Sequence, residues 1–383
     1  MNTLAGQNPD ITVKPVESKK MLKEFIKIPW TTGIYKNDTA WVPPIIFDQM
    51  KILDPKKGWF FEFGEVQLFI AYKGRKPVGR ISAHVDQRYE EKYDKGTGFF
   101  GFYEAINDPD VARSLFFEAE EWLRSKGKKT MNGPQSFSVY DPIGFEVKGE
   151  DIMPVVGLFH YAPYYNDHVK ALGFSKSTDW HAILVKLETY NEYFNVIRDE
   201  LMKGKDWDYV ALDKKQIKKR AQDLKNIFNV AWEGNHGHLP FTDKQFDLLF
   251  DELSPIVIPE LAQFAEKDGK TIAFMLTVPD VNPFLKKLNG RLYPWRVIRL
   301  LFDLKFRKPK RLRTILLGVL PEHRGKHIDD IFYLMGIPWA KANGYEVSEC
   351  SLIVESNKKM LGAIKNLNGE IYKTYRLYEK SIG

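Results

Sequence analysis

The sequence contains a single cysteine, Cys350, among 383 residues. One thiol cannot form an intrachain disulfide bond, so the class of small secreted proteins stapled by disulfides is excluded. No apolar run approaches the roughly 18 residues that a membrane-spanning helix needs, and the first residues show no secretory signal. We therefore expect a cytoplasmic protein, one that could also lie on a membrane surface.

What the chain does have is enough apolar material for folded domains. Hydrophobic residues make up 44% and charged residues 28%, which excludes disorder for most of the chain. The length predicts two domains of ordinary size. Lys and Arg number 57 against 50 Asp and Glu, and this net charge of +7 permits a phosphate-bearing, membrane or nucleic-acid partner.

The two halves of the chain share one order of predicted elements: a strand, a helix, a hairpin with a glycine turn, a strand and a second helix. In the first half these elements are a strand at 11–16, a helix opened by Ser18, a hairpin at 66–85 turning at Gly74, a strand at 97–102, and a helix from Pro109 to Gly127. In the second half they are a strand at 207–212, a helix at 214–232, a hairpin at 261–278 turning at Gly269, a strand at 313–320, and a helix ending at Gly344. We infer two divergent copies of one α/β unit with a mixed sheet, at 1–190 and 205–383.

The segment 321–327, Pro-Glu-His-Arg-Gly-Lys-His, lies between a predicted strand and a predicted helix. A strand-to-helix turn that holds glycine and basic residues presents free backbone N–H groups and a positive helix end to an anion. The segment therefore predicts a site for a phosphate or pyrophosphate group.

At this turn the sequence resembles the GNAT superfamily of acyl-CoA N-acyltransferases, whose signature Q/R-x-x-G-x-G/A starts here at Arg324. The resemblance extends over about 11–187 and 205–383, and its form is close to bacterial tandem GNAT-like proteins. It implies a tandem GNAT-like fold, acetyl-CoA or another acyl-CoA as the acyl donor, an amine as the acceptor, and no metal. The cofactor-binding residues that it implies are Leu317, Val319, Arg324, Gly325, Lys326, His327, Ile328 and Asn357.

The signature also shows departures from the family pattern. Its two small positions fall on His327 and Asp329, whose side chains would crowd the phosphate, and Asp329 adds like-charge repulsion. The tyrosine that many members use as a general acid corresponds to Ile364. The first copy has no Arg-Gly turn after Phe102, so we expect a cofactor site in the second copy only.

Direct acyl transfer needs a base that removes a proton from the amine, without a covalent enzyme intermediate. Glu349 and Glu355, on or beside the next predicted strand, are the carboxylates best placed for this role, although both could be solvated strand-end residues. Cys350 alternates with Glu349 along the strand, so only one of the two can face the cleft. We expect Cys350 to be a buried structural thiol.

The loop that follows the helix at 214–232 carries the predicted acceptor-binding residues Glu233, Asn235, His236 and His238. Two histidines two residues apart could ligate a metal, but no third ligand lies within sequence reach. An acceptor-lining loop and an ordinary polar turn remain the two interpretations.

An insertion at 286–313 carries eleven basic residues and one acid, Asp303, with aromatic and aliphatic residues at helical spacing between them. Three interpretations are open: a cover over the cleft with its basic side in water, a docking surface for anionic lipid, and a nucleic-acid contact. Nucleic acid is the least favoured, because the apolar arc is broad and no RNA-binding motif accompanies it.

The leading functional hypothesis is a transferase that moves an acetyl or longer acyl group from acyl-CoA to an amine. A non-catalytic scaffold with the same fold is the first alternative, supported by His327 and Asp329. A tRNA- or lipid-dependent aminoacyl or fatty acyl transferase is the second.

Overall fold

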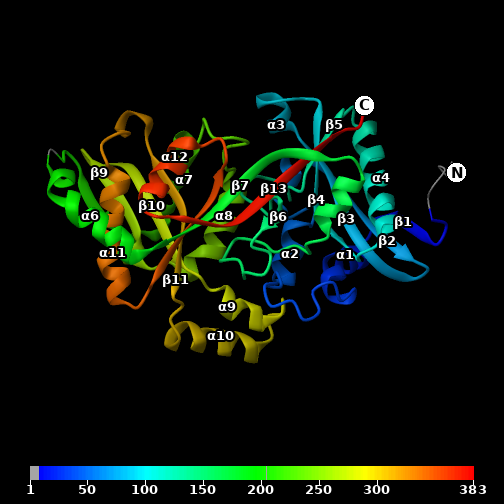
Figure 1. Cartoon of the computed structure of the whole chain (residues 1–383), viewed down its shortest axis with the longest axis horizontal. Helices are drawn as coiled ribbons and strands as arrows, with labels where there is room; N and C mark the ends of the chain where they lie inside the picture. Colours follow the sequence, from blue (N-terminus) through cyan, green and yellow to red (C-terminus); the bar gives the residue numbers. More distant parts are fainter. Residues whose placement is uncertain (1–7, 204) are drawn as a thin grey trace. The chain divides into compact units, whose positions relative to one another are not determined.

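The computed structural model describes residues 8–203 and 205–383, which form two compact units (Figure 1). The first unit contains residues up to Trp180 together with Leu285–Ile298 and Lys373–Gly383, and the second contains His181–Phe284 and Arg299–Tyr372. Each unit has its own buried apolar core. The two copies expected from the sequence, 1–190 and 205–383, differ from these units at 181–190, 285–298 and 373–383, and their boundaries stay a prediction.

The first unit is a mixed sheet in the order β1-β2-β3-β4-β5-β13, covered by helices. Its strands are β1 (Ile11–Pro15), β2 (Gly64–Lys73), β3 (Lys76–Asp86), β4 (Thr97–Ala105), β5 (Thr130–Gly133), β6 (Phe145–Lys148), the first half of β7 (Ser175–Lys186) and most of β13 (Glu370–Ser381). Its helices are α1 (Lys19–Thr31), α2 (Ile46–Ile52), α3 (Gln87–Lys92), α4 (Pro109–Ser125) and α5 (Tyr165–Ala171). Helix α4 packs on β1, β2 and β3.

The second unit repeats this plan with the order β7-β12-β11-β10-β9-β8. Its strands are the second half of β7, then β8 (Asp208–Ala211), β9 (Ala262–Lys267), β10 (Lys270–Pro279), β11 (Arg311–Val319) and β12 (Val347–Val354). Its helices are α6 (Leu187–Met202), α7 (Ile217–Ala231), α8 (Asp243–Leu253), α11 (Ile328–Ala342) and α12 (Lys358–Asn366). Helix α9 (Asn282–Leu285) precedes the insertion at 286–313, and α10 (Pro294–Phe306) lies within it, with its first residues in the first unit and the rest in the second.

Local sequence explains these elements. Asp108 caps the N-terminus of α4 with Pro109 in its first turn, and the chain leaves that helix through Gly127 at a φ of 73°. The hairpins β2–β3 and β9–β10 turn at Gly74 and Gly269, both at positive φ. The predicted elements of both halves are therefore confirmed.

Both units share a strand irregularity that sequence patterns did not indicate. In the first unit β4 carries an extra residue opposite β3, between Gly101 and Glu104, and in the second Ile315 of β11 is an extra residue opposite β10. The pairs β4–β5 and β11–β12 both run parallel. This common plan supports the tandem architecture.

Helices cover the two faces of the second unit's sheet. Phe274 of β10 and Gly318 of β11 meet Ile227 of α7 on one face. Ala273 and Met275, whose side chains alternate with Phe274, belong to the core around α11 on the opposite face. β11 is therefore a central strand that is packed on both faces.

Candidate acyl-CoA site

A gap opens in the sheet of the second unit where β11 and β12 stop pairing. The two strands are paired in parallel from Arg311 and Val347 as far as Thr314 and Cys350. β11 then continues to Val319 and β12 to Val354, and among the described residues the two strands form no further pairs. The end of β11 therefore has one free side.

The register of β10 and β11 determines which backbone groups face this free side. The N–H of Leu320 donates to the carbonyl of Ile272, and bonding alternates along an antiparallel pair. Gly318 and Leu320 therefore face β10, whereas Leu317 and Val319 direct their N–H and C=O groups away from it. Two strand N–H groups are thus presented side by side at the edge of the gap.

The turn after β11 offers a second set of donors. Among residues 8–203 and 205–383, no acceptor pairs with the backbone N–H groups of residues 325–328, which lead into the first turn of α11. A Cβ placed on Gly325, which has a φ of 76°, would meet no atom within 4 Å. The turn thus combines open space, free N–H groups and a positive helix end, and these fit a pyrophosphate.

Arg324 makes two hydrogen bonds to backbone carbonyls, and its assignment to the cofactor stays a prediction. Its guanidinium donates to the backbone carbonyl of Ala231 at 2.6 Å and to that of Val319 at 3.4 Å. These contacts attach the turn to the end of α7. Nζ of Lys326 lies 3.4 Å from Oδ2 of Asp206. Lys326 belongs to the turn, so it is a cation close in the chain to the free N–H groups.

The two departures at the helix start have visible consequences. His327 adopts a left-handed φ of 54°, and its Nδ1 lies 2.7 Å from Oδ2 of Asp330. Asp329 is mostly buried, and burial, followed by the charge of Asp330, raises the pKa of its carboxyl. A raised pKa reduces the negative charge that would oppose a phosphate at this helix end.

Glu349 lies on the paired part of β12, opposite Arg313 and two residues before Ser351. Its side chain is fully buried, and its Oε2 lies 3.5 Å from Nε of Arg313. Burial raises the pKa of Glu349 to about 7, even though the charge of Arg313 lowers it. A carboxylate with a pKa in this range can accept a proton near neutral pH. Cys350, in contrast, is buried in the core on the other face, as expected.

The remaining sequence-predicted residues beyond β12 have more ordinary surroundings. Glu355 is half-buried after the end of the strand. The side chain of Asn357 caps α12 by accepting from the N–H of Met360 at 3.2 Å. Ile364, which stands where the family tyrosine is expected, is buried in the apolar core.

The predicted acceptor loop begins directly after Trp232, at the end of α7. Glu233 and His236 are exposed, Asn235 is half-buried, and His238 is buried against Phe228. The two histidines thus differ in their surroundings. In the part of the chain that the structure describes, no group of three or more His, Cys, Asp or Glu side chains could hold a metal ion.

Three residues near the gap were missed by sequence reasoning. The indole of Trp232 donates to the carbonyl of Leu317 at 2.8 Å, and Arg313 faces Glu349. Tyr333 of α11 lies beside Thr314 and Cys350, the last paired residues, and burial raises the pKa of its phenol well above the usual value. The helical period of α11 places Tyr333 among core residues. The sequence therefore gave no reason to single out its hydroxyl group.

The corresponding gap in the first unit is filled by the chain itself. After β5, Gln135 donates its N–H to the carbonyl of Phe100, and Ser136 accepts from the N–H of Phe102. The carboxylate of Asp108 caps the N-terminus of α4 and lies 2.5 Å from Nζ of Lys73. Neither the strand edge nor the helix end is left open for an anionic ligand.

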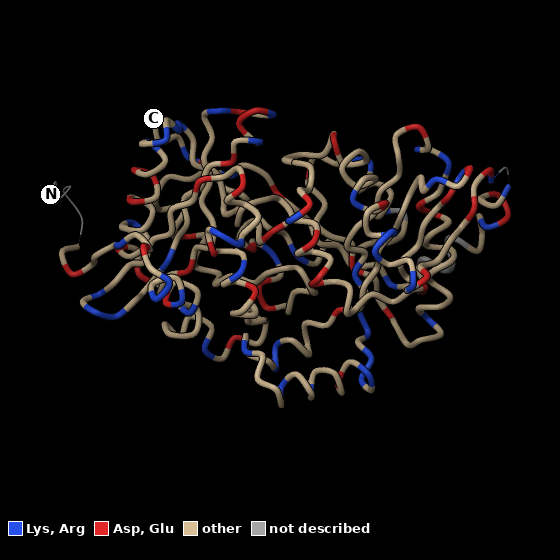
Figure 2. The backbone as a smooth tube through the Cα atoms, turned by 180° about the vertical axis from the view of Figure 1, so that it is seen from behind, with Lys and Arg blue, Asp and Glu red and all other residues tan. Residues whose placement is uncertain are grey.

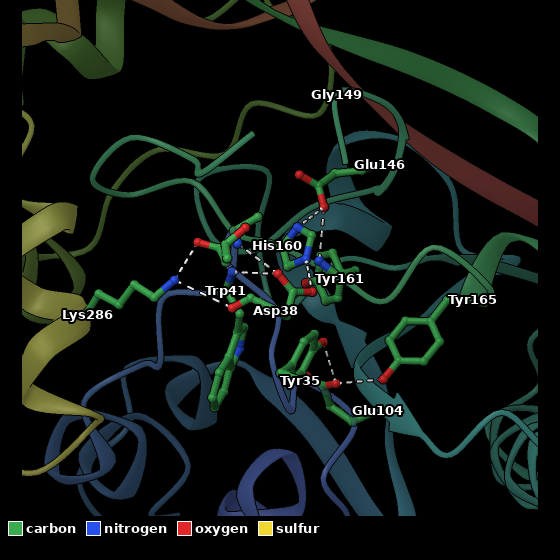
Figure 3. Close-up of polar contacts among 12 residues, drawn as sticks. Tyr35, Asp38, Trp41, Glu104, Glu146, Gly149, His160, Tyr161, Tyr165 and Lys286 are labelled. Atoms are coloured by element: carbon green, nitrogen blue, oxygen red, sulfur yellow. Dashed lines mark hydrogen bonds and ion pairs between the residues drawn. The ribbon is translucent and has the colours of Figure 1, made fainter. Parts of the chain in front are cut away.

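The first unit instead holds a buried polar network at the end of β4 (Figure 3). Glu104 accepts hydrogen bonds of 2.7 Å from the phenols of Tyr35 and Tyr165, with Arg80 3.7 Å away. His160 lies between Asp38 and Glu146, at 2.8 and 2.7 Å, and Glu146 also accepts from Lys373. Opposite charges are matched throughout this network, which is typical of a structural role.

Burial acts against the charged form of His160, but the hydrogen bonds and charges of Glu146 and Asp38 outweigh it and raise its pKa. Burial also raises the pKa of Glu104, while Arg80 lowers it. His160 therefore carries its proton to a higher pH than an exposed histidine, and the protonated ring connects the two carboxylates.

None of the helices in the described residues is long and apolar enough to cross a bilayer. No family model matches the chain. Protein YghO of Escherichia coli (strain K12) is 32% identical over 384 residues, which cover 97% of this chain and 95% of that protein. The bacterial ceramide synthase of Caulobacter vibrioides is 32% identical over 382 residues, which cover 98% of each chain.

Solved structures show the same fold at much lower identity. A tandem GNAT protein from the clavulanic acid biosynthesis pathway superposes with a TM-score of 0.54 at 12% identity, over 97% of this chain and 99% of that one. The expected fold class is therefore confirmed. The chain is a tandem GNAT-fold protein and belongs to the family that contains YghO and the bacterial ceramide synthase.

Proposed function

We propose that the protein is an N-acyltransferase that moves an acyl group from acyl-CoA to the amine of a long-chain amino alcohol. The fold and the relatives support acyl transfer in general terms. The name of the ceramide synthase relative supports the acceptor, because a ceramide is an amino alcohol acylated on its nitrogen. The observation that carries the proposal is the pair of outward-directed N–H groups at Leu317 and Val319, close in the chain to an open anion-binding turn.

In this proposal the strand edge and the turn hold the donor. A carbonyl of the pantetheine accepts from the N–H of Leu317, and the pyrophosphate binds the N–H groups of residues 325–328. The N–H of Val319 then polarises the thioester carbonyl, so negative charge that develops on its oxygen is stabilised.

The chemical step needs one base and one acid. The amine nitrogen attacks the thioester carbon, a C–N bond forms, and the C–S bond breaks to release CoA thiolate. Glu349 accepts the proton that the amine loses, for which a pKa of about 7 is suited. The released thiolate takes its proton from solvent, because the raised pKa of Tyr333 makes its phenol a weaker acid than an ordinary tyrosine.

The first copy takes no part in donor binding in this proposal. Its chain fills the gap beside β4, and Asp108 occupies the start of α4. Its matched polar network indicates that it stabilises the fold.

The experiment is to incubate the full chain with acyl-CoAs of increasing length and a saturated long-chain amino alcohol. Free CoA and the amide product are both measured, the latter by mass spectrometry. We expect equal amounts of both, and loss of both in Leu317→Pro, which removes one strand N–H. Absence of CoA release with every donor and acceptor would contradict the proposal.

A binding protein without turnover is the second candidate, favoured by Asp329 in the first turn of α11. It predicts no heat on mixing with any acyl-CoA in a calorimeter and no CoA release with any amine. The same preparation distinguishes the two functions.

A further inference from the structure

The insertion helix α10 presents its apolar side to solvent. Trp295, Ile298, Leu301, Phe302 and Phe306 have exposed fractions of 65%, 67%, 60%, 55% and 62%. Their positions follow the three- and four-residue steps that place side chains on one face of a helix. The buried side chain of this helix is Asp303, which is 2% exposed.

This arrangement is the reverse of a helix that covers a cleft. A cover would bury its large apolar side chains and direct its charges to water. Here five large apolar residues of one helix are more than half exposed, and Leu292 and Tyr293 just before it are exposed as well. Contiguous exposed apolar surface of this kind marks a site of interaction.

Cations surround the apolar face. Arg291, Arg299, Lys305 and Lys308 are exposed, and among the residues described here none of the four lies in an ion pair with a carboxylate. Figure 2 shows Lys and Arg positions on α10 and the segments that flank it. Residues 286–313 carry a net charge of +10, while the rest of the chain has 46 basic and 49 acidic residues.

An apolar pocket adjoins the C-terminal end of α10. It has a volume of about 260 Å³ and is lined by Leu304, Lys305 and Lys308 from the insertion. Its apolar wall is completed by Trp339 of α11 and by three residues that precede β9: Ile256, Val257 and Ile258. Two cations thus border a pocket that is itself apolar.

We propose that α10 docks the protein on the surface of an anionic phospholipid bilayer, with its axis parallel to the membrane. The apolar face enters the boundary between headgroups and acyl chains, and Trp295 lies at the level that indole rings prefer. Arg291, Arg299, Lys305 and Lys308 contact lipid phosphates. A helix of this length lies along about 20 Å of membrane surface.

Charge distinguishes this partner from two others. A symmetric contact with a second copy would bring the same cations face to face, which is repulsive. A nucleic acid would neutralise the cations but would leave the five apolar side chains in water. A bilayer with anionic headgroups satisfies both the charge and the apolar surface.

The inference goes beyond the proposed function and is tested without substrate. The full chain is floated with vesicles of phosphatidylcholine alone, or of phosphatidylcholine and phosphatidylglycerol in equal parts. We expect retention on the anionic vesicles only, falling with added salt. Brominated lipids should quench part of the tryptophan fluorescence of the wild type and less of it in Trp295→Phe.

Two variants separate the charge from the apolar face. Arg299→Gln with Lys305→Gln should weaken vesicle binding about 30-fold, because each basic residue near an anionic surface contributes roughly a factor of five. Phe302→Ser with Phe306→Ser should weaken it at least tenfold. Both variants change exposed side chains, so thermal unfolding should remain close to the wild type.

Matched controls use equally exposed residues elsewhere. Phe47→Ser replaces a phenylalanine that is 68% exposed, and Lys218→Gln with Lys219→Gln removes two exposed cations of α7. Neither should change vesicle binding. The proposal is overturned if the protein does not bind anionic vesicles or if the α10 variants bind them as well as the wild type does. It is also overturned if the wild type is a dimer and the α10 variants are monomers.

Discussion

Glu349 provides the sharpest test of the proposed site, because its pKa and its role are linked. Burial moves the pKa of its carboxyl from 4.5 to about 7. This shift corresponds to about 3 kcal/mol of preference for the neutral form. Near pH 7 about half of the molecules therefore carry the carboxylate that accepts the amine proton, and one pH unit lower about a tenth do.

The expected pH profile follows from this fraction. The value of kcat/KM should rise about tenfold per pH unit below pH 7 and level off above it, provided that Glu349 is the base. Glu349→Gln removes the titrating group and should lower kcat by a factor of about 100 to 10,000, the usual contribution of a general base. The assay is release of free CoA at saturating acyl-CoA across the pH range.

Stability supplies an independent readout. A carboxyl whose folded pKa is raised contributes stability that is present below its unfolded pKa and lost as pH rises through the folded value. The wild type should therefore lose stability between about pH 4.5 and pH 7 relative to Glu349→Gln. Denaturant unfolding at several pH values measures this difference.

Glu346→Gln is the matched control, because Glu346 is exposed just before β12 and pairs with Lys310 at the surface. It should alter neither kcat nor its pH profile. A flat profile in the wild type, or a Glu349→Gln protein that keeps more than a tenth of the activity, would refute the assignment of the base.

Two further changes test other parts of the molecule. Asp329→Asn removes a carboxyl from the start of α11 and should tighten acyl-CoA binding about fivefold, as about 1 kcal/mol of like-charge repulsion disappears; calorimetry measures this, and an unchanged or weaker Kd would contradict an anion site there. His160→Gln breaks the link between Asp38 and Glu146 and should cost roughly 1–3 kcal/mol of stability. Because the folded pKa of His160 is raised, this loss should be largest below about pH 6.5 and shrink as pH rises through the folded value, and a pH-independent difference in denaturant midpoint would exclude a protonated ring.

Much of the fold follows from patterns within short stretches of the chain. Glycine turns at Gly74 and Gly269 and helix ends at Gly127 and Gly344 occur at positive φ, as the turn chemistry requires. The alternation of Glu349 with Cys350 correctly places the thiol in the core. Such features depend on neighbours two to four residues away, so the sequence alone predicts them.

Only part of the candidate site can be predicted from neighbours two to four residues apart in the sequence. The motif located the turn at 321–327, and its assignment of Arg324 to the ligand stays a prediction. The sequence did not indicate that the guanidinium of Arg324 donates to the backbone carbonyls of Ala231 and Val319. Trp232 reaches the carbonyl of Leu317 across many residues of sequence. Nothing in either segment by itself indicates this contact.

What the sequence by itself determined is the order of elements, the tandem plan and the location of the charged insertion. Only the tertiary structure shows where the pairing of β11 with β12 ends and that residues 135–136 close the corresponding gap in the first unit. It also shows that the apolar side of α10 faces water. It also decided the pKa of Glu349, which depends on how completely the side chain is buried. The physical reason is that register, burial and charge pairing arise between elements far apart in the chain, whereas helix and strand patterns arise within each element.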